Sequence, residues 1–172
     1  MTTDESEGRT HGFLGEEFLT WLWYRWETDG GEYALSAGRS VGVALDDFLS
    51  FAAPSEDETE QTLRRGLPTR TAEARTALRQ GRRLKKAKLI VAEGSRQWLC
   101  TLDAPTMTLS GVRLPEDAED IESPQDRTAD RAANWLALHE VVSAVYGVFL
   151  RERLGSGYLA DGGEKQAQWM AQ

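Results

Sequence analysis

The sequence predicts an α+β fold in which a small antiparallel sheet packs with about three helices. Two segments near the ends of the chain, residues 15–27 and 126–154, have apolar residues at helical spacing. Between them lie short segments in which apolar and polar residues alternate, as in strands with one buried face. The chain has 172 residues, 40% of them hydrophobic, which is enough for one core. We therefore expect a single domain over residues 13–154.

The first expected helix, over residues 15–27, is rich in tryptophan. Glu16 and Glu17 stand in its first turn, where the helix dipole favours negative charge. The glycines at 30 and 31 end it. Its apolar stripe, which predicts one buried face, consists of Phe18, Leu19, Leu22, Trp23 and Trp26.

Strands are expected between the terminal helices. Residues 32–51 predict two short strands, because apolar residues alternate with small ones and an aspartate pair interrupts the run. Residues 59–65 predict a third strand, which a Gly-Leu-Pro sequence closes. Residues 97–102 and 107–114 flank a turn-like tetrapeptide and predict a hairpin.

The middle of the chain predicts an amphipathic basic helix that begins at residue 69 or 71 and ends near residue 91. At about 100° per residue, its cations fall within an arc of roughly 100°, across from its apolar side chains. No acidic residue stands between Arg75 and Lys88, so no i,i+4 pair offsets the repulsion between these cations. The cations of this arc are Arg75, Arg79, Arg82, Arg83 and Lys86.

A long apolar helix is expected over residues 126–154, after an acidic loop. Residues 1–12 are polar and acidic and predict a disordered tail, and the glycine-containing residues 155–172 predict a flexible one. The apolar stripe of the long helix, which is expected to face the core, consists of Trp135, Leu138, Val142, Val145, Tyr146 and Phe149.

Neither a membrane span nor export is expected. The most apolar segment, residues 132–150, is interrupted by Asn134, His139 and Glu140. The first residues are acidic, where a secretory signal has basic ones. A single cysteine, Cys100, forms neither an internal disulfide nor a zinc site by itself. We therefore expect a cytoplasmic protein without a structural metal.

Charge is unevenly distributed along the chain, whose formal net charge is −8. Residues 64–96 hold eleven Lys and Arg against two acids, a local charge of +9, and the remainder carries −17. Clustered like charges repel one another within a Debye length of about 10 Å. A cationic ridge roughly 15–20 Å long can meet several phosphates, which favours a polyanionic partner. The alternative is docking against an acidic surface, including the chain's own residues 116–122.

Residues suited to catalysis are few. The chain has two histidines, so no histidine triad or histidine-rich metal site is available. The phosphate-binding pattern G-x-x-x-x-G-K-[ST] does not occur, nor does the pattern G-x-G-x-x-G after a predicted strand. We therefore expect a protein that is not an enzyme and binds no cofactor. The less favoured alternative, a metal-dependent nuclease, would use Asp46, Asp47 and Asp103, with Lys85 or Lys88 as helper.

The aromatic residues of the first helix allow three interpretations, of which base stacking is the least favoured because it usually needs basic residues beside the rings and only Arg25 is near in sequence. Burial in a large aromatic core is the simplest one. Trp21 and Tyr24 project away from the main stripe, however, and Trp and Tyr are enriched in interface hot spots. Trp21, Trp23 and Tyr24 are therefore candidates for self-association or for contact with a protein partner, as in the scaffold subunit of a larger assembly.

The middle and end of the chain resemble the C-terminal half of the RdgC family, the recombination-associated DNA-binding proteins of bacteria. The resemblance covers residues 16–154. It is carried by a helix start at Thr71-Ala72-Glu73, the step Gln80-Gly81-Arg82, and a continuation through Leu84, Lys86 and Leu89. A hairpin, an acidic loop and a terminal hydrophobic helix follow in the same order as in that family.

The resemblance implies an α+β protein that binds double-stranded DNA without sequence preference and modulates recombination, in a cytoplasmic, nucleoid-associated oligomer. Members of the family form ring-shaped dimers. The family's basic pair falls at Arg64 and Arg65, and its helix cations fall at Arg82 and Lys86. The nucleic-acid-binding residues expected from charge and resemblance together are Arg64, Arg65, Arg75, Arg79, Arg82, Arg83 and Lys86.

Overall fold

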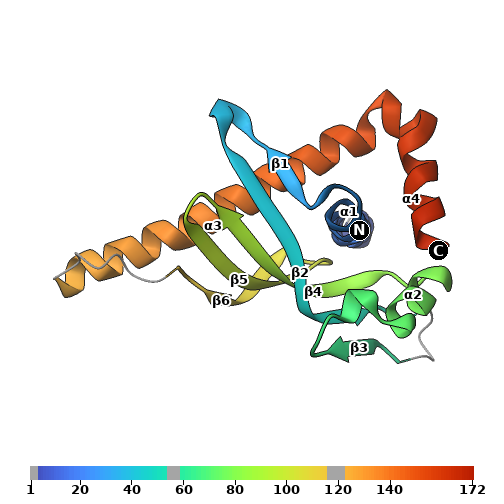
Figure 1. The fold of residues 1–172 in the computed structure, drawn as a ribbon, viewed down its shortest axis with the longest axis horizontal. Coiled ribbons are helices and arrows are strands. Elements are labelled where there is room, and N and C mark those ends of the chain that lie inside the picture. Colours follow the sequence, from blue (N-terminus) through green and yellow to red (C-terminus); the bar gives the residue numbers. More distant parts are fainter. Residues whose placement is uncertain (1–3, 54–58, 116–122) are drawn as a thin grey trace.

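A six-stranded antiparallel sheet forms the centre of the computed structural model, with four α-helices around it (Figure 1). The structure describes residues 4–53, 59–115 and 123–172. This arrangement confirms the α+β fold that the sequence predicts.

The helices are α1 (Asp4–Asp29), α2 (Ala72–Arg79), α3 (Pro124–Leu154) and α4 (Gly163–Met170). The strands are β1 (Glu32–Ala34), β2 (Ser40–Phe51), β3 (Gln61–Arg64), β4 (Leu84–Glu93), β5 (Arg96–Asp103) and β6 (Thr108–Arg113). Short helical turns, η1 (Ser36–Gly38), η2 (Pro68–Arg70) and η3 (Tyr158–Gly162), connect some of them.

Strand β2 holds the sheet together, because three other strands pair with it. The main order is β1-β2-β4-β5-β6, and β3 pairs with the second half of β2. Strand β2 therefore has β4 along one side, and β1 and β3 in succession along the other. The predicted hairpin is confirmed as β5 and β6, and the strand predicted at residues 59–65 is confirmed as β3.

An irregularity in β2 replaces the break predicted at its aspartate pair. Leu45 pairs with Leu89 and Leu49 with Ala87, so three residues of β2 lie opposite the single residue Lys88. The extra residues keep both leucines on the buried face, where each is at most 2% exposed. Residues 40–51 therefore form one bulged strand, where the sequence predicted a break between two short strands.

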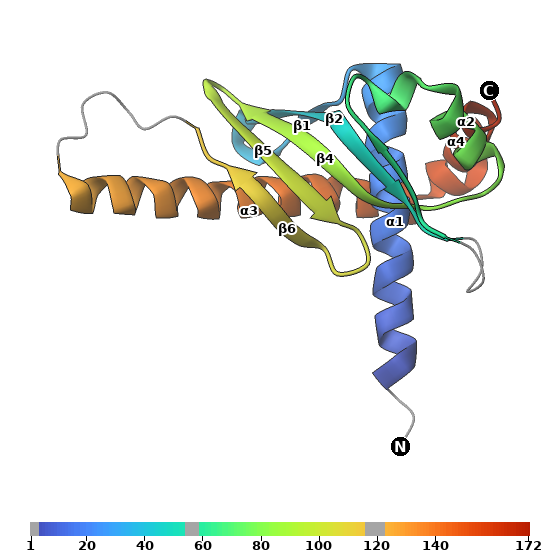
Figure 2. The same ribbon diagram turned by 90° about the horizontal axis from the view of Figure 1, so that it is seen from below.

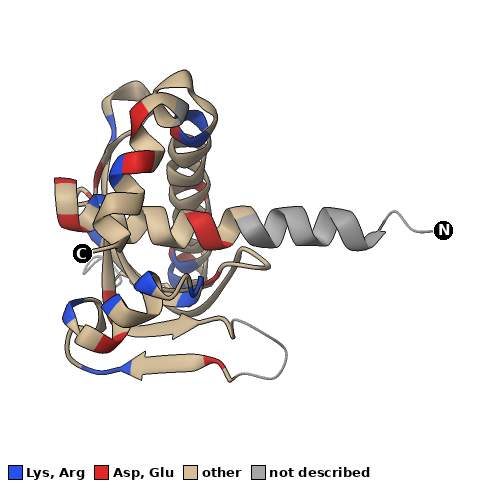
Figure 3. Ribbon diagram, turned by 90° about the vertical axis from the view of Figure 1, so that its right-hand side faces the viewer, with Lys and Arg blue, Asp and Glu red and all other residues tan. Residues whose placement is uncertain are grey.

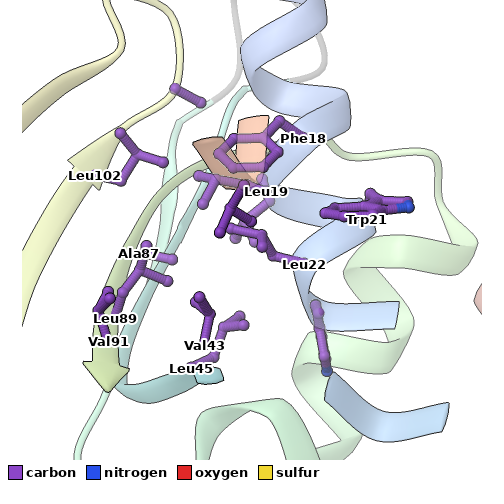
Figure 4. Packing of buried hydrophobic residues seen from close by; sticks show 14 of the residues in the cluster. Phe18, Leu19, Trp21, Leu22, Val43, Leu45, Ala87, Leu89, Val91 and Leu102 are labelled. Carbon is purple, nitrogen blue, oxygen red and sulfur yellow. The ribbon is translucent and has the colours of Figure 1, made fainter. Parts of the chain in front are cut away.

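Helices α1 and α3 cover one face of the sheet, and none of the described helices packs across the other face. Phe18 of α1 packs against Phe149 of α3 with ring centroids 5.5 Å apart. The Trp98 indole N–H of β5 donates to the backbone carbonyl of Asn134 in α3 (3.0 Å). Figure 4 shows Leu19 and Leu22 of α1 directed toward Leu89 and the other inward-facing strand residues. The uncovered side is called the open face below.

The predicted central basic helix is wrong beyond residue 79. Helix α2 begins where Thr71 caps it by accepting a hydrogen bond from the Ala74 N–H, and it ends at Arg79. Gly81 follows with φ 74°, a left-handed conformation that ends helices. Residues 84–93 then form β4, in which the inward positions Ala87, Leu89 and Val91 are at most 1% exposed.

The predicted flexible tail at residues 155–172 is also wrong. Helix α4 packs the Trp169 ring against Trp23 and Tyr24 of α1, both with centroids 5.5 Å apart, and Trp169 is 5% exposed. Its indole N–H donates to the Glu27 carboxylate (2.9 Å). The C-terminal segment is therefore part of the core.

The first and third helices differ from the predictions mainly at their N-terminal ends. Helix α1 begins at Asp4, so residues 4–12 are helical where a disordered tail was predicted; residues 1–3 lie outside the described residues. Helix α3 begins at Pro124, close to the predicted residue 126, and Ser123 caps it. The acidic loop predicted before it falls largely on residues 116–122, which the structure does not describe.

Trp169→Ala is expected to lower the free energy of unfolding by about 3–5 kcal/mol, because it leaves a cavity between α1 and α4. It also removes one donor to Glu27. Chemical denaturation measures the change, with the exposed neighbour Gln168→Ala as the control on the same helix. A loss below about 1 kcal/mol would mean that α4 does not belong to the core.

Candidate nucleic-acid interface

Part of the open face carries polar and basic side chains at positions that alternate with the buried ones, beside an apolar row formed by Ala44, Ile90 and Leu99. Across its middle, Lys88 of β4 pairs with Thr101 of β5, which pairs with Ser110 of β6. These residues surround a hollow of about 580 Å³. Its lining comprises Asp47, Phe48, Arg64, Arg65, Lys86, Lys88, Thr101 and Ser110.

Strand pairing brings three of the predicted nucleic-acid-binding residues to this hollow. Arg64 on β3 pairs with Phe48, and Lys86 on β4 pairs with Ser50, two positions further along β2. Because β3 and β4 flank the same strand, residues 22 positions apart in sequence lie around one hollow. Arg65 follows in a turn, where its N–H donates to the backbone carbonyl of Asp47 (2.8 Å).

Two lysines of the hollow are paired with aspartates of the open face. The Lys88 ammonium lies 2.9 Å from a carboxylate oxygen of Asp46 and 2.9 Å from one of Asp47, which the bulge of β2 brings opposite it. Lys86 lies 2.8 Å from the Asp103 carboxylate. The Lys88 hydrogen bond lowers the pKa of Asp47, and hydrogen bonds to Asp47 and Asp46 raise that of Lys88.

The arginines of the open face are placed differently. The Arg64 guanidinium stacks over the Phe48 ring, 5.0 Å from its centroid, and remains exposed. Arg65 and Arg113 are exposed too. In the part of the chain that the structure describes, none of the three is within salt-bridge distance of a carboxylate. Among the described residues, the open face thus carries these three arginines and two lysines together with Asp46, Asp47, Asp103 and, by its pairing with Gly42, Glu32.

Arg75 has a structural position, which corrects its prediction as a DNA contact. Its guanidinium pairs with the Glu27 carboxylate and lies 5.5 Å from the Trp23 ring centroid and 5.0 Å from that of Trp169. Glu27 also accepts both indole N–H groups. Arg75 therefore joins α2 to α1 and α4.

The other predicted cations do not form one basic row. Arg79 is exposed at the end of α2. In the turn after α2, Arg82 donates to the Thr59 carbonyl (3.3 Å) and Arg83 pairs with Glu16 (3.3 Å). In the view of Figure 3, segments with Lys or Arg are interspersed with segments with Asp or Glu. The prediction of a basic ridge on a central helix is thus wrong. Arg64, Arg65 and Lys86 lie around one hollow. The other four predicted cations, Arg75, Arg79, Arg82 and Arg83, do not line it.

The predicted partner surface on the first helix is wrong for its two tryptophans. Trp21 is 2% exposed and donates its indole N–H to Glu152 of α3 (3.0 Å), and Trp23 is fully buried. Tyr24 is half-buried and packs against Trp169 of α4. The aromatic-core interpretation of these residues is the one that the structure supports.

The carboxylates considered for a nuclease are separated between two lysines. Asp46 and Asp47 pair with Lys88, and Asp103 pairs with Lys86. Among the described residues, no group of three or more His, Cys, Asp or Glu side chains could hold a metal ion. Lys85, the other proposed helper, pairs with Glu60.

Sequence reasoning missed two cations of the open face, Lys88 and Arg113. The signal for Lys88 was the alternation of Ala87, Leu89 and Val91 with the residues between them, a strand pattern. Lys88 is absent from the predicted binding residues because the predicted helix continues past Gly81, where the structure has a strand. Arg113 has no such signal, because its position depends on its pairing with Leu99 across the hairpin.

Comparisons with known proteins give no relative for the chain. No family model matches it, and neither the curated proteins nor the solved structures give a significant match.

The thiol of Cys100 is expected to be unreactive in the folded protein. Cys100 is 1% exposed on the covered face of the sheet, and burial raises its pKa to about 11. Since the thiolate is the reactive form, an aromatic disulfide reagent at mildly alkaline pH should label it only after denaturant is added. Rapid labelling of the folded chain would contradict this packing.

Proposed function

We propose that this chain binds double-stranded DNA through the open face of its sheet, without sequence preference and without catalysis. The observation that carries the proposal is the placement of Arg64, Arg65, Lys86, Lys88 and Arg113 on one exposed sheet face. Arg64, Arg65 and Lys86 are among the binding residues expected from the sequence. Lys88 and Arg113 take the place of the cations that were expected on a central helix.

Phosphates would first meet the three arginines, which have no carboxylate within salt-bridge distance among the described residues. A guanidinium binds phosphate through two parallel hydrogen bonds, and its planar fork is held ready at Arg64 by stacking on Phe48. The Thr101 and Ser110 hydroxyls beside them can donate further hydrogen bonds. Contacts to phosphate position a protein on DNA but do not identify bases, so this chemistry fits sequence-independent binding.

Lys86 and Lys88 would contribute only by leaving their aspartates. Exposed ion pairs in water are weak, so a phosphate can replace a carboxylate at either lysine. The three aspartates and the net charge of −8 oppose the approach of DNA. We therefore expect affinity in the non-specific range, a Kd of about 10⁻⁴–10⁻⁶ M at physiological salt.

A role in modulating recombination, in a nucleoid-associated protein, is the part of the proposal that rests on the resemblance to the RdgC family. The geometry of the open face supports only the DNA contact. A nuclease is not proposed, because each of its candidate carboxylates is paired with a lysine. A scaffold subunit that contacts a protein partner through Trp21 and Trp23 is not proposed either, because both side chains are buried.

Replacing Arg64 and Arg65 with glutamate is expected to abolish DNA binding at physiological salt. Fluorescence anisotropy with two duplexes of unrelated sequence measures the affinity as salt is varied. For the unmodified chain, log affinity should fall with log salt with a slope of about −3, since each of three contacted phosphates contributes about −0.9. The two duplexes should give the same curve.

The matched control changes the same charge elsewhere. Arg131→Glu with Lys165→Glu alters two exposed cations on α3 and α4, away from the open face. This control should lower the affinity for DNA only slightly, because it changes the net charge of the protein without removing a phosphate contact. Equal losses in the two double variants would show that net charge, rather than the open face, governs binding, and no binding by the unmodified chain at low salt would refute the proposal.

A further inference from the structure

A second cavity lies where α4 meets α1 and α2. Helix α4 lies beside α2 in Figure 1 and in the turned view of Figure 2. The cavity has a volume of about 250 Å³ and is called the α4 cavity below. Among the described residues, none that lines it also lines the hollow of the open face. Its polar lining includes Glu16, Glu17, Thr20, Arg82, Arg83 and Gln166.

Gln166 of α4 is a buried polar residue that lines this cavity. Its side chain belongs to a residue that is 7% exposed. Its amide carbonyl accepts the Tyr158 hydroxyl at 3.5 Å, which is long for a hydrogen bond between two oxygens. In the described part of the chain, its amide nitrogen donates no hydrogen bond. Because buried polar groups of folded proteins are almost always hydrogen-bonded, Gln166 is a candidate group for binding a ligand.

The backbone before α4 has a rare conformation that holds Tyr158 against the cavity. The segment η3 is a π-helical turn, in which the Gly163 N–H donates to the Tyr158 carbonyl. A Cβ atom at Gly162 or at Gly163 would come within 3.2 Å of the Tyr158 ring, so the glycines let the ring lie close to the helix. Turns of this kind are frequent at functional sites. The turn is therefore a second observation that points to a ligand.

Two carboxylates of α1 line the α4 cavity. A carboxylate oxygen of Glu16 lies 3.3 Å from the Arg83 guanidinium. A carboxylate oxygen of Glu17 lies 2.8 Å from the Arg153 guanidinium. A carboxylate has about four lone-pair sites, so each of these groups can accept further hydrogen bonds from a ligand in the cavity.

Two guanidinium groups line the cavity from the turn between α2 and β4. Arg82 donates to the Thr59 carbonyl (3.3 Å), and Arg83 pairs with Glu16. A guanidinium has five N–H donors, so it can bind a ligand carboxylate in addition to its contacts within the chain. The charged groups that line the cavity are thus two carboxylates and two guanidinium groups, whose charges balance.

Apolar side chains also line the cavity. Leu78 of α2 is 4% exposed, and Met170 at the end of α4 is half-buried and packs against the core. Methionine adapts its shape to what it contacts. Sites for drug-sized ligands have volumes of about 300–1,000 Å³, so the α4 cavity suits a smaller molecule that has both charged groups and an apolar part.

We propose that the α4 cavity binds a free α-amino acid with an apolar side chain. The ammonium group of the ligand meets the two carboxylates of α1, and its carboxylate meets the guanidinium groups of the turn after α2. The Gln166 amide donates to the same ligand carboxylate, and the apolar side chain packs against Leu78 and Met170. A zwitterion adds no net charge to a cavity whose own charges balance, whereas a simple cation or anion would leave charge uncompensated.

The proposed site is independent of DNA binding. The ligand would join α1, the turn after α2 and α4, which are far apart in the sequence, and it would leave the open face available. Because a ligand that binds only the folded chain stabilises it, the amino acid should raise the melting temperature in the absence of DNA. Loss of either property leaves the other measurable.

Isothermal titration calorimetry without DNA tests the ligand class. L-leucine, L-methionine and L-phenylalanine are titrated into the unmodified chain, and at least one should bind. The amine that lacks the carboxylate of this ligand, and the carboxylic acid that lacks its amino group, should each bind at least about tenfold more weakly, because charged groups of the cavity then lose their partners. Equal affinity of either analogue, or no binding of the three amino acids at millimolar concentration, would overturn the proposal.

A glutamine substitution tests the site. Gln166→Leu should weaken binding about tenfold or more and keep the fold, since an apolar side chain of similar size replaces a buried amide. The matched control is Gln168→Leu, an exposed glutamine of the same helix, which should bind as the unmodified chain does. Met170→Trp is a second variant, whose larger side chain should fill the cavity and abolish binding. Unchanged affinity in a folded Gln166→Leu or Met170→Trp chain would refute the site.

Discussion

One-sided burial of the sheet is the constraint on which the rest of this structure depends. Helices α1 and α3 cover one face, so buried apolar residues alternate with less buried ones along most of β2, β4 and β5, and several of the residues between them are polar. The bulge in β2 preserves this division across its aspartates and, in doing so, places Asp46 and Asp47 opposite Lys88. The composition of the open face is thus a consequence of how the core is closed.

The segregation of charge in the sequence has a largely internal explanation. Cations of residues 75–88 pair with acids that are distant in the chain, as Arg75 does with Glu27 and Arg83 with Glu16. The excess of acid outside this segment therefore partly neutralises the excess of base within it. Arg64 and Arg65, which have no such partner in the part of the chain that the structure describes, lie at the end of β3 beside the open face. The DNA-binding proposal rests on this smaller set.

Sequence reasoning predicted the elements whose periodicity is strong and local. The terminal helices, β3 and the β5–β6 hairpin were recognisable from apolar spacing and turn residues. Residues 72–91 were misassigned because Ala, Arg and Leu favour helices, while the left-handed Gly81 and the alternation that follows carry the opposite signal. The position of helix α4 depends on the packing of Trp169 against Trp23. The hollow forms because β3 and β4 flank β2. Such long-range contacts leave no local pattern.

The most direct test of the open face as the DNA contact is protection of its lysines from acetylation. The chain would be treated with an acetylating reagent with and without duplex DNA, and each lysine quantified by mass spectrometry. DNA should protect Lys86 and Lys88, on the open face, and leave Lys165 of α4 equally modified. Unchanged modification of Lys86 and Lys88 under conditions where DNA is bound would contradict the account.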